Sequence, residues 1–218
     1  MCPDHLGWYT RNPVRNLTDG ADPLRSFLRY RLIDREALHV KNYVFKIIVA
    51  GDGGVGKTTL LHKYVTGTFM ADAQMTIGVQ FHLKTITIDD SAYILQLWDL
   101  GGQDRFRFML PSYVLGAKGA LLLLDTTRLI TLQSLEEWTD VCRTHVKDLP
   151  ILLCGTKVDL VEDRSVSPNL VKEYLETLNL FDYVEISAKT GQNVEQVFEM
   201  LLNKIASIPL LNSPNLPL

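Results

Sequence analysis

The chain has 218 residues, of which 46% are hydrophobic and 22% are charged, and its formal net charge at pH 7 is −3. That balance excludes a global basic field for nucleic acid or an anionic membrane, so we expect no nucleic-acid partner. The three cysteines, Cys2, Cys142 and Cys154, show neither disulfide nor zinc spacing, which indicates a reducing compartment and predicts a cytoplasmic location.

The first 42 residues form an N-terminal extension that differs from the rest of the chain. Residues 1–22 carry scattered glycine and proline without a period. An Asp-Pro pair at 22–23 is typical of a helix start, and the spacing of the apolar residues after it predicts an amphipathic helix over 23–38. Three interpretations of this extension stay open: a segment docked on the following domain, a membrane-surface helix, or a loose tail.

Membrane attachment has little support in the sequence. No window is apolar for the roughly 18 residues that a span needs, and the N-terminus has no signal-peptide core. Residue 2 is Cys rather than Gly, and no cysteine follows Cys154, so we expect neither myristoylation nor C-terminal prenylation. We therefore expect no membrane contact. We also expect the protein to be a monomer.

From Tyr43 onward, short apolar runs alternate with stretches of helical period. The runs are Tyr43–Ala50, Val79–Ile88, Tyr93–Trp98, Ala120–Leu124, Ile151–Cys154 and Tyr183–Ile186, and the helical stretches lie near 57–66, 134–146, 168–178 and 194–207. This alternation predicts an α/β domain over 43–208, with a six-stranded, mostly parallel sheet. The gap Asp89–Ala92 is too short for a crossover helix, so it predicts one antiparallel hairpin. The Pro-rich segment 209–218 is interpreted as a tail.

A glycine-rich loop directly follows the first predicted strand. Residues 51–58 read GDGGVGKT, which matches the phosphate-binding pattern GxxxxGK[ST]. Glycines let the backbone N–H groups turn inward around phosphates, and the next helix points its positive N-terminal end at them. Lys57 can supply a cation for the outer phosphates, and the Thr58 hydroxyl can ligate Mg²⁺. The alternative is a plain Gly-rich turn, which the strand before it and the helix after it disfavour.

A second motif indicates which base is bound. Thr156-Lys157-Val158-Asp159 follows an apolar strand, so Asp159 lies where parallel sheets bind ligands. Guanine presents two adjacent donors that one carboxylate can accept, whereas adenine presents an acceptor there. Ser187, Ala188 and Lys189 follow the last strand and could place an N–H on the guanine O6. Taken alone, each motif is also compatible with an ordinary surface loop.

Two further segments have the residue types that a γ-phosphate and a metal ion need. Asp99 closes the third predicted strand and can hold Mg²⁺ through water, while the Gly102 N–H can contact a γ-phosphate and Gln103 can orient an attacking water. Thr76 is a candidate second hydroxyl ligand of Mg²⁺. The alternatives are a plain turn at Gly101-Gly102 and an inert loop residue at Thr76.

Together these motifs resemble the Ras superfamily of small GTPases, over roughly Tyr43 to Ile208. The resemblance implies a phosphate-loop G domain with helices on both faces of the sheet, binding GTP or GDP with Mg²⁺. It implies Mg²⁺ ligation by Thr58 and Thr76, with Asp99 in the outer shell. It implies catalysis by Lys57 and Gln103, and a γ-phosphate contact by Gly102. The remaining nucleotide contacts that it implies are Gly51, Gly53, Gly54, Val55, Gly56, Thr59, Phe69, Thr156, Lys157, Asp159, Ser187, Ala188 and Lys189. For Phe69, which would stack on guanine, a place in the core is the alternative.

Some positions depart from the family pattern. Thr156 stands where many members have Asn, so a hydroxyl replaces an amide. Ala73 stands where many have a Tyr that covers the phosphates. Subfamily signals are mixed: Gly101-Gly102-Gln103 looks like Arf proteins, whereas Thr76-Ile77-Gly78-Val79 looks like Rab proteins. We therefore assign the superfamily, Rab-like with some Arf-like features, and no subfamily.

The expected function is a molecular switch in signal transduction or vesicle transport that hydrolyses GTP to GDP and phosphate. No arginine lies between His62 and Thr76, so no arginine from that segment can assist in cis, and we expect slow turnover without an activating partner. Arg105 and Arg107 are interpreted as solvated charges. Effector, activating and exchange proteins are expected to contact residues 68–78 and 101–113. The alternative function is an interaction module that binds GTP or GDP with little hydrolysis.

Overall fold

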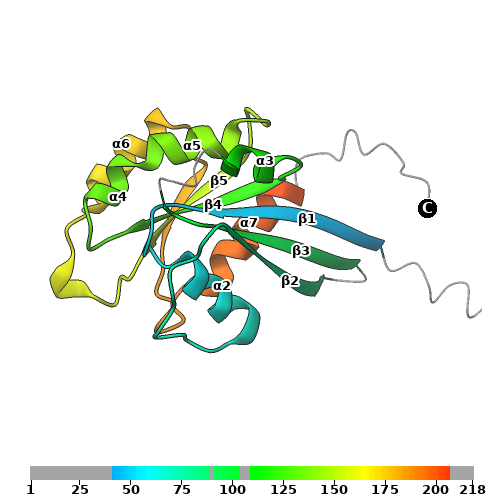
Figure 1. Cartoon of the computed structure of the whole chain (residues 1–218), viewed down its shortest axis with the longest axis horizontal. Coiled ribbons are helices and arrows are strands. Elements are labelled where there is room, and N and C mark those ends of the chain that lie inside the picture. The colour runs from blue at the N-terminus through cyan, green and yellow to red at the C-terminus, as the bar shows by residue number, and fades with distance from the viewer. Residues whose placement is uncertain (1–40, 89–90, 104–108, 207–218) are drawn as a thin grey trace, which may run out of the picture. The chain divides into compact units, whose positions relative to one another are not determined.

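The computed structural model describes residues 41–88, 91–103 and 109–206 (Figure 1). The predicted helix over 23–38 and the predicted tail over 209–218 lie outside these residues, as do Arg105 and Arg107.

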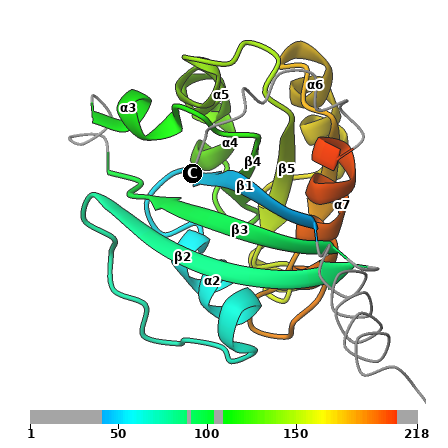
Figure 2. The same cartoon turned by 90° about the vertical axis from the view of Figure 1, so that its right-hand side faces the viewer.

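Six strands of the described chain form one mixed sheet. They are β1 (Lys41–Ala50), β2 (Val79–Ile88), β3 (Ser91–Leu100), β4 (Gly119–Asp125), β5 (Ile151–Thr156) and β6 (Asp182–Glu185). Their order in the sheet is β2-β3-β1-β4-β5-β6, and every neighbouring pair is parallel except β2 and β3. Figure 2 labels β1 to β5 in this order. The predicted six-stranded sheet with one antiparallel hairpin is confirmed.

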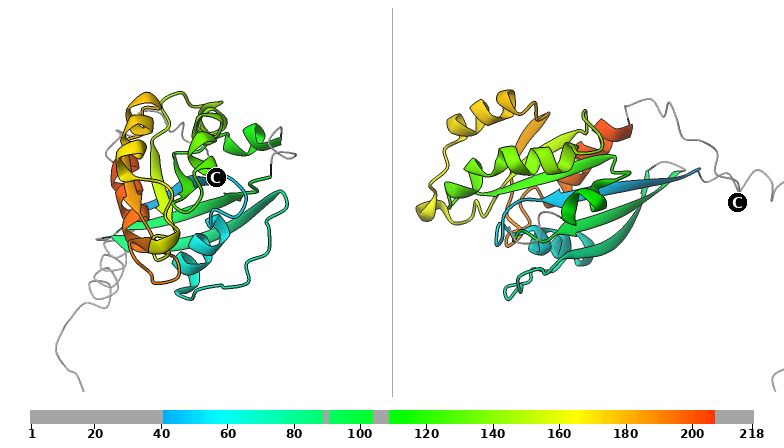
Figure 3. Two further views of the ribbon diagram at one scale, coloured as in Figure 1. Left: turned by 90° about the vertical axis from the view of Figure 1, so that its left-hand side faces the viewer. Right: turned by 45° about the horizontal axis from the view of Figure 1, so that its top comes forward.

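Helices cover both faces of this sheet, as predicted. The helices are α2 (Lys57–Thr66), α3 (Leu110–Val114), α4 (Ile130–Gln133), α5 (Leu135–Arg143), α6 (Pro168–Thr177) and α7 (Val194–Ala206), and a 3₁₀ turn, η2, spans Val161–Asp163. Buried residues of α2 and α7 pack on one face, and those of α3, α5 and α6 pack on the other (Figures 1 and 3).

The central strands are buried on both sides, which explains why they are apolar without alternation. In β4, all of the residues are buried, including its last residue, Asp125. In β1, Ile47 and Val49 face α2 and α7, whereas Ile48 and Ala50 face the opposite cluster. Both faces of a parallel sheet need such cover, so this pattern follows from the topology.

The predicted helix near 134–146 differs from the structure at both ends. Helical structure starts earlier, at α4, and α5 ends at Arg143. The end has a local cause: the Thr144 N–H bonds the carbonyl of Val141, only three residues back, and the Thr144 hydroxyl donates to the Asp140 and Val141 carbonyls. The five-residue helix α3 has no counterpart in the prediction because it is too short to show a period.

Strand direction places the loops that follow the parallel strands at one edge of the sheet. The carboxyl ends of β1, β3, β4 and β5 lie together because these strands are mutually parallel. In such sheets, ligands bind outside the carboxyl ends of the strands. Within the described residues, no helix is long and apolar enough to cross a membrane.

Candidate functional site

The loop between β1 and α2 has the backbone of an anion-binding site. Gly54 and Gly56 have positive φ values of 73° and 99°, which favour glycine. Gly51 also has a positive φ, and a Cβ there would lie 2.3 Å from the carbonyl oxygen of Leu123, so a side chain does not fit. The buried Lys57 ammonium donates to the carbonyls of Gly51 and Asp52 at 2.7 and 2.8 Å. A cation and a helix N-terminus therefore converge on this loop.

A cavity of about 490 Å³ opens beside the loop, within the size range of small-ligand sites. It is bounded by the phosphate loop, by residues 69–76 and by the loops that follow β5 and β6. Every nucleotide-site residue predicted from the sequence lines this cavity except Gly51, Asp99, Gln103 and Ser187. Segments more than a hundred residues apart in the sequence thus meet at one site.

Three side-chain oxygens from three segments meet at one end of the cavity. The Thr58 hydroxyl oxygen lies 2.5 Å from Oδ2 of Asp99 and 2.7 Å from the Thr76 hydroxyl oxygen. Asp99 is fully buried, and burial raises the pKa of its carboxyl group against the opposing effects of the Thr58 hydrogen bond and the Lys57 charge. Its other oxygen, Oδ1, has no hydrogen-bond partner among the described residues. Hard cations such as Mg²⁺ prefer oxygen donors of this kind.

The segment after β3 presses against the phosphate loop. A Cβ built on Gly102 would lie 2.3 Å from the carbonyl carbon of Asp52 and 2.4 Å from the nitrogen of Gly53, so only glycine allows this approach. The amide nitrogen of Gln103 contacts the sulfur of Met75, which lies next to Thr76. The two segments expected to respond to a γ-phosphate are therefore in contact with each other.

The other end of the cavity is built by the loops after β5 and β6. Ser187 is buried, and its hydroxyl donates to Oδ1 of Asp159 at 2.6 Å, which fixes the carboxylate. The Thr156 hydroxyl lies 2.7 Å from the carbonyl oxygen of Val55, so it reaches the phosphate loop despite replacing an amide. Phe69 lines the cavity and is 41% exposed, which excludes its interpretation as a core residue.

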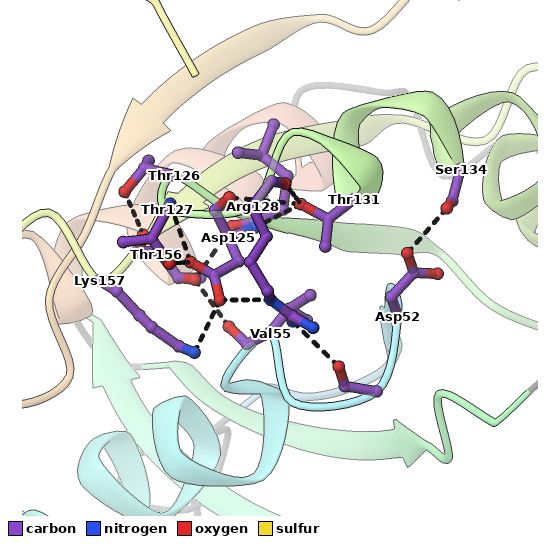
Figure 4. Close-up of polar contacts among 12 residues, drawn as sticks. Asp52, Val55, Asp125, Thr126, Thr127, Arg128, Thr131, Ser134, Thr156 and Lys157 are labelled. Atoms are coloured by element: carbon purple, nitrogen blue, oxygen red, sulfur yellow. Dashed lines mark hydrogen bonds and ion pairs between the residues drawn. The ribbon is translucent and has the colours of Figure 1, made fainter. Parts of the chain in front are cut away.

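Several polar residues around the phosphate loop were not predicted from the sequence (Figure 4). Trp138 and Ser134 donate to the two carboxylate oxygens of Asp52, both at 2.7 Å. Asp125 ends β4 and bonds both Arg128 and Lys157. The sequence held one signal for Asp125: it is a lone carboxylate at the end of an apolar parallel strand. Asp159 stands in a similar place, shortly after the end of the next strand. No comparable signal marks Asp52, Ser134 or Trp138.

Comparisons with known proteins agree with this geometry. The sequence model of the Ras family matches residues 46–207. The Ras-related protein RABA4a of Arabidopsis thaliana is 39% identical over 168 residues, which is 77% of this chain and 74% of that protein. The Ras-related proteins Rab11A of Lotus japonicus and Rab11B of Nicotiana tabacum are each 38% identical over 168 residues, 77% of this chain and 74% and 77% of theirs.

Proposed function

The chain belongs to the Ras family of small GTPases, as a Rab-like member that binds and hydrolyses GTP, and we propose from this premise how its own residues perform that reaction. The observation that carries the proposal is the convergence of Thr58, Thr76 and Asp99 beside the phosphate loop. It unites a helix start, the loop before β2 and the end of β3 at one point.

We propose that this oxygen cluster holds Mg²⁺. The hydroxyls of Thr58 and Thr76 would ligate the ion, and Asp99 would hold it through water. The unpartnered Oδ1 of Asp99 supports this assignment, since a buried oxygen without a partner is costly. When bound, the ion neutralises charge on the outer phosphate oxygens. Chelation with EDTA is therefore expected to accelerate GDP release by about tenfold or more.

Hydrolysis needs an in-line attack by water on the γ-phosphorus. The new bond joins the water oxygen to that phosphorus, the bond from the phosphorus to the β–γ bridging oxygen breaks, and GDP and phosphate leave. In our proposal Lys57 and the loop N–H groups stabilise the charge on the phosphate oxygens, and Gln103 orients the water. Arg128 lies beside the loop, but its guanidinium is bonded to Asp125 and Gly53, which supports slow turnover without an activating partner.

Base selection is assigned to Asp159, with Lys157, Ala188 and Lys189 around it. The hydrogen bond from Ser187 leaves the carboxylate oriented to accept from two adjacent donors of guanine. Phe69 would pack against the base from the opposite side of the cavity. Its exposure and its place in the lining support this role.

The switch itself is assigned to residues 68–78 and 101–113, which we propose as the contact surface for effector, activating and exchange proteins. Exposed apolar side chains support the assignment: Met75 is 62% exposed and Ile77 is 71% exposed. Tyr113 continues this surface through Trp98 to Phe81, with ring centroids 6.1 and 5.2 Å apart. A role in vesicle transport is proposed from the Rab-like relatives.

Single-turnover hydrolysis of bound GTP tests the catalytic assignment. Gln103→Leu is expected to slow hydrolysis by about 10- to 100-fold, because the water loses its orientation, while GDP affinity stays unchanged. Gln133→Leu, at the end of α4, is the matched control and is expected to hydrolyse at the wild-type rate. Equal rates for all three proteins would remove Gln103 from the mechanism. If the wild-type protein itself shows no detectable hydrolysis of bound GTP, the alternative function is favoured, a binding module with little turnover.

A further inference from the structure

Asp125 is a buried carboxylate with a partner on every side. It is the last residue of β4, and its side chain is fully buried. Oδ1 accepts from the N–H of Thr127 at 3.0 Å and from its hydroxyl at 2.7 Å (Figure 4). Oδ2 accepts from Nε of Arg128 at 2.8 Å and from Nζ of Lys157 at 2.7 Å. These bonds use the full acceptor capacity of a carboxylate.

One of these partners belongs to the base end of the cavity. Lys157 lines the cavity and lies two positions before Asp159 in the sequence. Its backbone has a φ of 62°, which a residue with a side chain adopts only when its surroundings impose it. The ion pair with Asp125 is one such constraint, because it fixes the end of the Lys157 side chain.

The other cationic partner belongs to the phosphate end. Nη2 of Arg128 donates to the carbonyl oxygen of Gly53 at 3.0 Å, and it would lie 3.7 Å from a Cβ on Gly54. Arg128 therefore braces the part of the phosphate loop that has positive φ values. Because Nε of the same guanidinium is held by Asp125, the planar group cannot turn away without breaking both contacts.

We propose that Asp125 is a positioning residue that couples the base loop to the phosphate loop, by holding Lys157 and Arg128 on one buried carboxylate, and so slows nucleotide release. The inference rests on the proposed function, in which these two loops hold the base and the phosphates. Neither Asp125 nor Arg128 needs to touch the nucleotide for this role.

The test is the release rate of fluorescent mant-GDP from the full-length protein in the presence of Mg²⁺ and excess GDP. Arg128→Met keeps an apolar stem but loses both contacts. It is expected to release GDP about 3- to 10-fold faster, the size of the lost hydrogen bond to Gly53, because an ion pair of a side chain that is 40% exposed adds little. Asp125→Asn loses the charge that holds two cations, and is expected to release it about 10- to 100-fold faster. In the double variant, the two effects should not multiply, since Arg128 acts through Asp125.

Arg143→Met is the matched control. Arg143, the last residue of α5, also donates to two backbone carbonyls, those of Leu178 and Asn179, but none of these three residues lines the cavity. This variant is expected to release GDP at the wild-type rate even if the midpoint temperature of its thermal unfolding falls. A purely structural role for Arg128 would instead lower the fraction of binding-competent protein and leave the release rate of that fraction unchanged.

Two results would overturn the inference: an unchanged release rate in Arg128→Met, or effects of Asp125→Asn and Arg128→Met that multiply in full. If Asp125→Asn does not fold, the release rate of Arg128→Met still decides, because that side chain is 40% exposed and its loss creates no buried cavity. A wild-type protein that binds no mant-GDP would contradict the proposed function itself. If the wild-type protein binds mant-GDP and Arg128→Met releases it at the same rate, only the coupling is contradicted.

Discussion

The hydroxyl of Thr156 lies 2.7 Å from the carbonyl oxygen of Val55, although 101 residues separate them in the sequence. Its single proton is shared with the carbonyl of Leu124 at 3.0 Å. Thr156 is the last residue of β5 and Val55 lies inside the phosphate loop, so this side-chain hydrogen bond ties the end of β5 to the backbone of the phosphate loop. The side chain is buried, which makes the contact sensitive to any change of donor.

Thr156→Ala is expected to destabilise the protein by about 1–3 kcal/mol, because it leaves the buried carbonyl of Val55 without its donor. Urea unfolding of the GDP-bound protein measures this change. Thr156→Ser keeps the hydroxyl and is expected to lose less than about half as much. Equal losses in both variants would assign the effect to the missing methyl group rather than to the hydrogen bond.

Asp159→Asn is expected to exchange guanine specificity for xanthine specificity. The carboxylate accepts from two guanine donors, whereas an amide can accept from one donor and donate to the xanthine oxygen that replaces the amino group. A competition titration against mant-nucleotides measures both affinities. We expect the affinity for GDP to fall by about 100-fold or more and the affinity for XDP to rise. Asp163→Asn, in η2, is the control for a neighbouring carboxylate. Unaltered preference for GDP in Asp159→Asn would remove this residue from the base site.

Gly102→Ala is expected to affect the GTP-bound state more than the GDP-bound state. A Cβ at this position would overlap the backbone of Asp52 and Gly53, so the segment after β3 must move away from the phosphate loop. Hydrolysis is then expected to fall by about tenfold or more, since the adjoining Gln103 moves with it. Gly116→Ala is the control outside the cavity, with positive φ but open space around it. Normal hydrolysis in Gly102→Ala would show that this close approach is not used in turnover.

The two buried thiols are expected to resist alkylating and disulfide reagents. Burial raises the pKa of Cys142 to about 12 and also raises the pKa of Cys154 well above its usual range. At pH 8 both thiols are therefore held in the protonated form, whereas the thiolate is the reactive form. With Cys2→Ser as background, a thiol-specific dye should label no site in the folded protein and two in urea. Fast labelling without urea would contradict the described core.

The sequence predicted the parts of the molecule that depend on local spacing. The glycine pattern at 51–58 identified the phosphate loop, and the four-residue gap at 89–92 identified the hairpin. Contacts that depend on strand order were not predictable in this way. Arg128 reaches Gly53 only because β4 lies directly beside β1, and 75 residues separate the two in the sequence. The bonds from Ser134 and Trp138 to Asp52 depend on the same packing.

The nucleotide that the protein carries is the most direct test of the central claim, that this cavity binds guanine nucleotide and hydrolyses GTP. The full-length protein is purified with Mg²⁺ and denatured, and the released nucleotide is identified by ion-exchange chromatography. We predict GDP in about equimolar amount, as expected for tight binding with turnover during expression. An adenine nucleotide in that amount would contradict the role of Asp159, and GTP recovered intact would contradict hydrolysis.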